Sequence, residues 1–264
     1  MKPIPAPFSG PPPEEVPLPR TPLVRVLGQI TFPLIAKLAQ QDGIADFQER
    51  IRDRYPLLTP EAVHHIEMMQ GAEPRVRTEP IWRFAAADQA WRVSLSTSFV
   101  ALETTAYTSR GDFVERLTEI ARAIEATIDP KLVLRIGVRY INRIDGPALD
   151  RLPELIKSEV LGVLQTPFKD AAQHLITESI LRTEEGQLLA RWGSLPAGAT
   201  IDPQALDAIP SPSWILDLDL YAIEQKPFSA DAIGARAKAF AQRQYAVFRF
   251  VITPEFLTFY GGRT

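Results

Sequence analysis

The order of apolar and polar residues along the chain predicts strands wherever β-branched and aromatic residues alternate with polar ones. In the first half of the chain the predicted strands cover residues 23–32, 81–84, 91–99, 100–106 and 132–144. The polar pair Asp88-Gln89 lies between two of these strands and predicts a hairpin turn. The stretch 57–79 fits a helix start at Thr59 and a strand equally well, so its type stays open.

Helices are predicted where apolar residues recur every three or four positions. Such a seam, made of Ile44, Phe47, Ile51 and Tyr55, predicts a helix over residues 43–55. A longer amphipathic helix is predicted over residues 110–128, where apolar residues occupy one face and charged residues the other. Ser109 and Asp112 form a capping-box-like start for it, which would satisfy free amides of the first turn.

The second half of the chain repeats this order. Its predicted elements are a short helix at 152–163, strands at 174–182, 187–195 and 214–223, a helix from Ser229 to Pro254, and a short strand at 256–260. Clustered strands followed by one long helix favour antiparallel sheets over a parallel α/β fold. We therefore predict an α+β fold of two similar halves, each an antiparallel sheet covered by a long amphipathic helix. The halves are 23–145 and 146–264, packed as one globule and preceded by a proline-rich arm, 1–22.

Composition restricts the chemistry more than it identifies it. With 264 residues, 45% of them hydrophobic, the chain has enough apolar surface for a sizeable core. The absence of cysteine excludes thiolate nucleophiles, thiolate metal sites, iron–sulfur clusters and disulfides. A net charge of −3 argues against a protein coated in nucleic acid. Because there is no apolar run of the ~20 residues that a membrane span needs, and no apolar leader, we expect a cytoplasmic protein without membrane binding.

The first 22 residues contain nine of the 24 prolines. Proline lacks an amide donor and fixes φ, so this arm is expected to be extended or disordered. It is either a polyproline ligand for a partner or a leader that lies along the surface of the domain, and we favour the leader.

Three arginines form the clearest polar feature of the sequence. Arg135, Arg139 and Arg143 recur at every fourth position of the predicted strand 132–144, so they share one face at steps of ~13 Å. Three guanidiniums on one face predict a site that binds phosphates or carboxylates, and Gly137 leaves room for the ligand to approach. In the structural alternative, these arginines pair with acids on neighbouring strands.

A pair of carboxylates forms a second, weaker feature. Asp217 and Asp219 lie two positions apart on a predicted strand, so both point to the same face. Carboxylate pairs of this kind bind Mg²⁺ or Mn²⁺ in metal-dependent nucleases, but no third ligand is placed here, so we predict no metal site. Direct pairing with the Arg135, Arg139 and Arg143 face would explain both features without any ligand.

Motifs that assemble a catalytic centre are not recognisable. The three histidines, His64, His65 and His174, do not form a zinc-binding pattern. Glycine-rich phosphate loops are missing, and Gly193-Ser194 lacks the second glycine of a nucleophile elbow. We therefore assign no catalytic residue, no cofactor and no metal.

Two sequence blocks carry a family resemblance, LETTAYTSRGDF at 102–113 and LRIGVRYINRID at 134–145. With LDLDLY at 216–221, they resemble a sporadically distributed bacterial protein family of similar length, whose members have no assigned activity. The resemblance runs from Pro22 to the C-terminal helix and implies no cofactor or catalytic residue. The patchy distribution of the family is consistent with mobile-element, toxin–antitoxin or defence-linked gene neighbourhoods.

These observations predict a non-enzymatic binding or interaction protein of a bacterial accessory system, with another protein as its partner. The alternative is an RNA- or nucleotide-binding module that uses the arginine-bearing strand, with weak metal-dependent nuclease activity. Arg83 and Arg92 flank the predicted hairpin turn and would extend the Arg135 face into a basic patch. A continuous basic surface would favour this alternative.

Overall fold

The protein is described by a computed structural model that covers residues 4–67 and 75–262. Within these residues nine strands form one sheet in the order β2-β3-β4-β5-β1-β6-β9-β8-β7. The pairs β2–β3, β3–β4, β4–β5, β7–β8 and β8–β9 are antiparallel. The predicted α+β class with antiparallel strands is confirmed.

The elements have the following bounds. The strands are β1 (Leu23–Thr31), β2 (Leu57–Glu67), β3 (Arg75–Ala85), β4 (Trp91–Leu95), β5 (Phe99–Thr104), β6 (Leu132–Asp145), β7 (Leu175–Arg182), β8 (Gln187–Leu195) and β9 (Ser213–Pro227). The helices are α1 (Ala45–Ile51), α2 (Arg110–Thr127), α3 (Pro147–Asp150), α4 (Leu152–Leu155), α5 (Ser158–Leu161), α6 (Ala230–Val251) and α7 (Pro254–Phe259). Short 3₁₀ helices cover Ala36–Ala39, Gln41–Ile44, Gly162–Gln165 and Pro167–Asp170.

The chain forms two compact units, each built from separate segments. The first unit contains Met1–Val26, Val138–Ala222 and Ala239–Thr264, and the second contains Leu27–Gly137 and Ile223–Lys238. The strands β1, β6 and β9 and the helix α6 each contribute residues to both units. The finer prediction of two similar halves, each with its own covering helix, is not confirmed.

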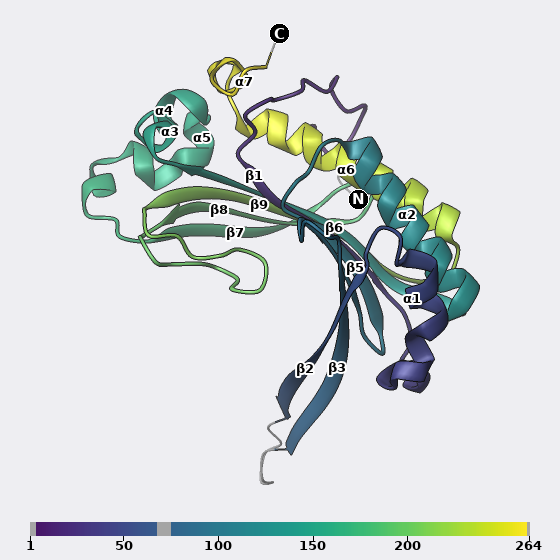
Figure 1. The fold of residues 1–264 in the computed structure, drawn as a ribbon. Coiled ribbons are helices and arrows are strands. Elements are labelled where there is room, and N and C mark those ends of the chain that lie inside the picture. Colours follow the sequence, from purple (N-terminus) through teal and green to yellow (C-terminus); the bar gives the residue numbers. More distant parts are fainter. Residues whose placement is uncertain (1–3, 68–74, 263–264) are drawn as a thin grey trace. The chain divides into compact units, whose positions relative to one another are not determined.

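In the second unit, α2 packs on the sheet through its apolar side. The Ser109 hydroxyl accepts a hydrogen bond from the Asp112 amide at 3.1 Å, which is the cap expected from the sequence. Phe113 stacks on Trp91 with ring centroids 6.1 Å apart. A Cβ at Gly28 of β1 would lie 2.8 Å from Leu117, so glycine at this position lets the helix approach the strand. Figure 1 shows α1 beside α2, and the long β2–β3 hairpin.

In the first unit, β7 is the terminal strand of the sheet and pairs with β8 alone (Figure 1). Gly193 of β8 makes this pairing possible, because a Cβ at that position would lie 1.8 Å from the Leu175 carbonyl oxygen. Its φ of +149° is also rare for residues that carry a side chain. The approach of β7 to β8 therefore depends on the missing side chain at position 193.

Some sequence expectations are corrected by the local chemistry. The predicted strand at 256–260 is instead helix α7, which starts with Pro254 and is capped by the Thr253 hydroxyl. The ambiguous stretch 57–79 contains β2 and the start of β3. The side chains of His64 and His65 lie outside the part of the chain that is described. Across the described residues, no helix is both long and apolar enough to cross a bilayer.

Candidate functional site

A cluster of buried charges lies on the strands of the first unit. Both oxygens of the Asp217 carboxylate accept hydrogen bonds from Arg139, Oδ1 from Nε at 2.8 Å and Oδ2 from Nη2 at 2.9 Å. Arg191 donates to Oδ2 as well, from Nε at 2.9 Å, and its Nη2 lies 2.7 Å from the same oxygen. The Asp217 side chain is only 1% exposed. One buried carboxylate therefore compensates two guanidiniums through charge-assisted hydrogen bonds.

The strand register explains how the cluster forms. Arg191 of β8 is directly opposite Asp217 of β9, and β6, which carries Arg139, is the other neighbour of β9. Directly opposed residues in a sheet point to the same face, so the carboxylate lies between two arginines from its two flanking strands. The direct pairing of arginines with acids, left open by the sequence, is therefore present at Arg139 and Asp217.

Arg139 also reaches a segment outside the sheet. Its Nη1 donates to Asp202 Oδ2 at 2.7 Å. Burial lowers the pKa of Arg139, but the hydrogen bonds and charges of Asp217 and Asp202 outweigh burial and raise its pKa above the ordinary value. For Asp202, burial raises the pKa, while the hydrogen bond and charge of Arg139 lower it more, so the pKa is lowered overall. Both groups therefore stay charged at neutral pH.

Arg143 binds the same segment in a different way. Its Nη2 donates to the main-chain carbonyl of Asp207 at 2.5 Å, and its Nε is buried without a hydrogen-bond partner among the described residues. Burial lowers the pKa of Arg143, and the charges of Asp145 and Asp207 oppose that shift only in part. Arg25 of β1 lies 3.4 Å from the Asp207 carboxylate.

We call the segment that these arginines hold the braced loop, residues 196–212, which connects β8 to β9. Its ends are tied by a hydrogen bond from the Gly198 amide to the Ile209 carbonyl at 2.7 Å. Inside it, the Thr200 hydroxyl donates to the Leu206 carbonyl at 2.6 Å, and Ala205 and Leu206 are buried. A compact loop with close ends that packs on its own side chains has the features of an Ω-loop.

The other residues singled out from the sequence are not part of this cluster. Arg135 lies in the second unit, where its Nη1 donates to the Gln29 side chain at 3.2 Å. Asp219 is half-buried on β9, two positions from Asp217. The described residues contain no group of three acids or histidines placed to hold a metal ion.

The arginines expected to extend a basic patch are also paired with acids. Arg83 donates from Nε to Glu61 at 2.9 Å and also donates to Ser94, and Arg92 donates to Glu103. The acids and arginines on these neighbouring strands therefore neutralise each other, which leaves less positive charge available to a polyanion.

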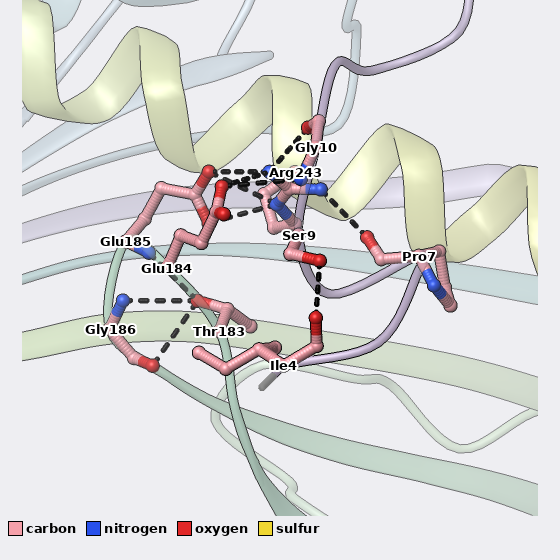
Figure 2. A network of polar contacts seen from close by, with 9 residues as sticks. All are labelled: Ile4, Pro7, Ser9, Gly10, Thr183, Glu184, Glu185, Gly186 and Arg243. Atoms are coloured by element: carbon pink, nitrogen blue, oxygen red, sulfur yellow. Dashed lines mark hydrogen bonds and ion pairs between the residues drawn. The ribbon is translucent and has the colours of Figure 1, made fainter. Parts of the chain in front are cut away.

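Sequence reasoning missed a further buried arginine, Arg243 of α6 (Figure 2). Its side chain is 3% exposed, and its Nε donates to both carboxylate oxygens of Glu185, at 2.9 and 3.0 Å. Its Nη1 and Nη2 donate to the main-chain carbonyls of Pro7 and Gly10, both at 2.8 Å. Figure 2 shows the guanidinium between the N-terminal arm and the turn that joins β7 to β8.

The rest of the arm is held along α6 and α7 by further polar contacts. The Tyr245 hydroxyl accepts from the Val16 amide at 2.7 Å, and the Arg20 amide donates to the Tyr260 carbonyl at 3.2 Å. The Arg20 side chain adds one contact, from Nη2 to the Phe259 carbonyl at 2.5 Å. The arm therefore lies on the surface of the first unit mainly through contacts that use its main chain. Arginines or tyrosines on the buried side of α6 would have been the only sequence signal for this docking.

Comparison with known proteins does not identify the site. No protein-family model matches the sequence, and no curated protein matches it.

Proposed function

We propose that this protein is a non-enzymatic binding protein and that the braced loop is the surface with which it recognises a protein partner. The observation that carries this proposal is that Arg139 and Arg143 both bind the braced loop. Their guanidiniums bind Asp202 and the Asp207 carbonyl, so they fix the loop on the sheet. A loop held by a rigid scaffold is the usual form of a recognition element.

The exposed residues of the braced loop suit contact with another protein. Pro203, Gln204, Asp207 and Ala208 are exposed, while Ala205 and Leu206 anchor the loop from below. Because the loop is already ordered, it would lose little conformational entropy when a partner binds. The resemblance in sequence suggests a bacterial accessory system, linked to mobile elements, toxin–antitoxin pairs or defence, as the setting.

The same contacts count against the RNA- or nucleotide-binding alternative. Binding of a polyanion needs guanidiniums that face solvent, whereas Arg139, Arg83 and Arg92 are each bonded to acids of this chain. A metal-dependent nuclease would also need a cluster of acids around its ion.

A photo-crosslinking experiment in lysate of the native host tests the proposal. A photoreactive amino acid replaces Gln204 on the braced loop or, as a matched control, Glu159 on the exposed surface of α5. We expect one discrete protein adduct from position 204 and none from position 159. The captured protein, once purified, should bind the wild-type chain and bind the Asp202→Asn variant more weakly.

Two results would contradict the proposal. One is the same set of adducts from both positions. The other is multiple turnover of any compound by the purified protein that disappears in the Asp217→Asn variant, because this would reveal a reactive centre at the buried cluster.

A further inference from the structure

One edge of the sheet lies in the first unit and is formed by strand β7. As the terminal strand, β7 pairs with β8 on one side only, so alternate N–H and C=O groups of Leu175–Arg182 point away from the sheet. Proteins usually protect such an edge with charged side chains, lysine above all, with proline, with a bulge or by keeping the strand very short. The exposed charges of β7 are one acid and one base, Glu178 and Arg182, so they can complement each other across a strand pair. The sequence of β7, LITESILR, contains neither proline nor lysine.

β7 also presents a large apolar side chain to solvent. Ile180 is 66% exposed, in a strand whose neighbours on the same face are the exposed residues Glu178 and Arg182. An exposed, apolar edge strand is an attachment point for another strand. The feature that requires explanation is therefore an exposed isoleucine, Ile180, with an acid two positions before it and a base two positions after it on the same face of the strand.

We propose that β7 pairs with β7 of a second copy of this chain, antiparallel, about a two-fold axis that passes Ile180. In this register Ile180 is opposite its own counterpart, and each Glu178 is opposite Arg182 of the other copy. Two opposite-charge pairs then flank one apolar pair on the same face, a combination of cross-strand pairs that stabilises sheets. The interface is isologous, because the same patch serves both copies.

The contacts beyond Arg182 agree with this register. The chain turns there, with the Thr183 amide donating to the Gly186 carbonyl at 2.9 Å. The Glu184 amide donates to the Phe8 carbonyl of the N-terminal arm at 3.2 Å, so the arm occupies the position beside residue 184. The arm therefore limits strand pairing on the C-terminal side of β7, and because the axis at Ile180 places residue 178 opposite residue 182, pairing is confined to residues 178–182. So short an interface predicts a dimer that dissociates on dilution.

Cysteine cross-linking provides the first test, because the natural chain contains no cysteine. Directly opposed residues in antiparallel strands have Cα atoms about 4.5–5.5 Å apart, within the range that a disulfide bridges. Under mild oxidation we expect Ile180→Cys to give a covalent dimer of the full chain. Thr177→Cys, an exposed position on the same strand that is not opposite itself in this register, is the matched control.

Charge reversal provides the second test. In Arg182→Glu each Glu178 faces a glutamate of the other copy, so the dissociation constant measured by sedimentation should rise about tenfold. Mixing Arg182→Glu with Glu178→Arg should restore a dimer, because every cross-strand pair is then of opposite charge. The unfolding free energy of each variant is measured alongside to confirm that it folds.

Three outcomes would overturn the inference. They are a wild-type chain that stays monomeric up to about 1 mM, equal cross-linking from positions 177 and 180, and no recovery of the dimer in the mixed sample. If Glu178→Arg does not fold, the cross-linking result alone decides. Because β7 is separate from the braced loop, these results do not depend on the proposed function.

Discussion

Two buried arginines of the first unit, Arg139 and Arg243, perform the same task with different chemistry. Each side chain is mostly buried, with exposed fractions of 14% and 3%, and each holds a segment outside the sheet. Arg139 holds the braced loop through a side chain, the carboxylate of Asp202. Arg243 holds the N-terminal arm through main-chain carbonyls, those of Pro7 and Gly10.

Whether the acceptor is a carboxylate or a main-chain carbonyl determines which residue types the contact needs. A contact through a carboxylate needs an acid at one position and depends on pH. A contact through carbonyls is available from any residue, so it depends on the path of the arm and very little on its side chains. The braced loop is therefore specified by residue type, whereas the arm is specified by its conformation.

The largest effect is expected at Asp217, which compensates both Arg139 and Arg191. Asp217→Ala leaves two buried guanidiniums without their shared carboxylate, so we expect the unfolding free energy to fall by about 3–5 kcal/mol. Chemical denaturation measures the change. Asp219→Ala, on the same strand but half-buried, is the control and should be much milder. Equal effects of the two substitutions would show that the buried cluster contributes no more to the unfolding free energy than an ordinary strand position.

Arg243→Met comes next, because it removes the contacts to Glu185 and to the arm together. Hydrogen bonds to charged groups contribute about 1.5–3 kcal/mol, and methionine retains the apolar stem, so we expect a loss of about 2 kcal/mol. Amide hydrogen exchange of Phe8 and Gly10 should accelerate in this variant. Arg249→Met is the control, since Arg249 lies 3.4 Å from the Glu14 carbonyl at an exposed contact. Unchanged exchange in the arm would mean that Arg243 does not hold it.

A smaller effect, about 1 kcal/mol at neutral pH, is expected for Asp202→Asn, because the charge-assisted bond to Arg139 becomes neutral while Asp217 still compensates the arginine. The pKa of Asp202 is lowered in the folded protein, so its carboxylate stabilises the fold above its unfolded pKa of about 4. That contribution is lost as the pH falls through the folded pKa. The difference between wild type and variant should therefore be constant from pH 7 to about 5 and shrink in stronger acid. A difference that grows on acidification would contradict this assignment.

The smallest effect should be found in the arm itself. Glu14→Ala removes an exposed side chain but keeps the carbonyl that Arg249 contacts. We expect the unfolding free energy to change by less than about 0.5 kcal/mol. A loss comparable to that of Arg243→Met would show that the arm is recognised by its side chains after all.

Local features of the fold were predictable because their causes are local. The cap at Ser109, the helix that it starts and the hairpin around Asp88 depend on residues within a few positions of each other. The prediction of a strand at 256–260 is wrong, because Thr253 caps helix α7 and Pro254 occupies its first turn, and these local signals outweigh the aromatic content of the segment.

The candidate site was predictable only in part. Periodicity placed Arg139 and Asp217 on strands and allowed them to pair, but it could not show that β6 and β9 are neighbours. The contacts of Arg243 were invisible, because its partners Pro7 and Gly10 lie more than 230 positions away and offer only carbonyls. Because every residue has a main-chain carbonyl, the order of residue types does not reveal which carbonyl accepts a hydrogen bond.

The absence of a side chain at Gly193 limits which sequence variants of this protein can fold. Even alanine would bring a methyl group against the Leu175 carbonyl, and nothing nearby is a flexible side-chain end that could swing aside. Among all single changes in β8, replacement of this residue should be the least tolerated in a mutational scan. Replacement of Gly193 should first disrupt the pairing of the outermost strand, β7, and with it any assembly that forms along that strand.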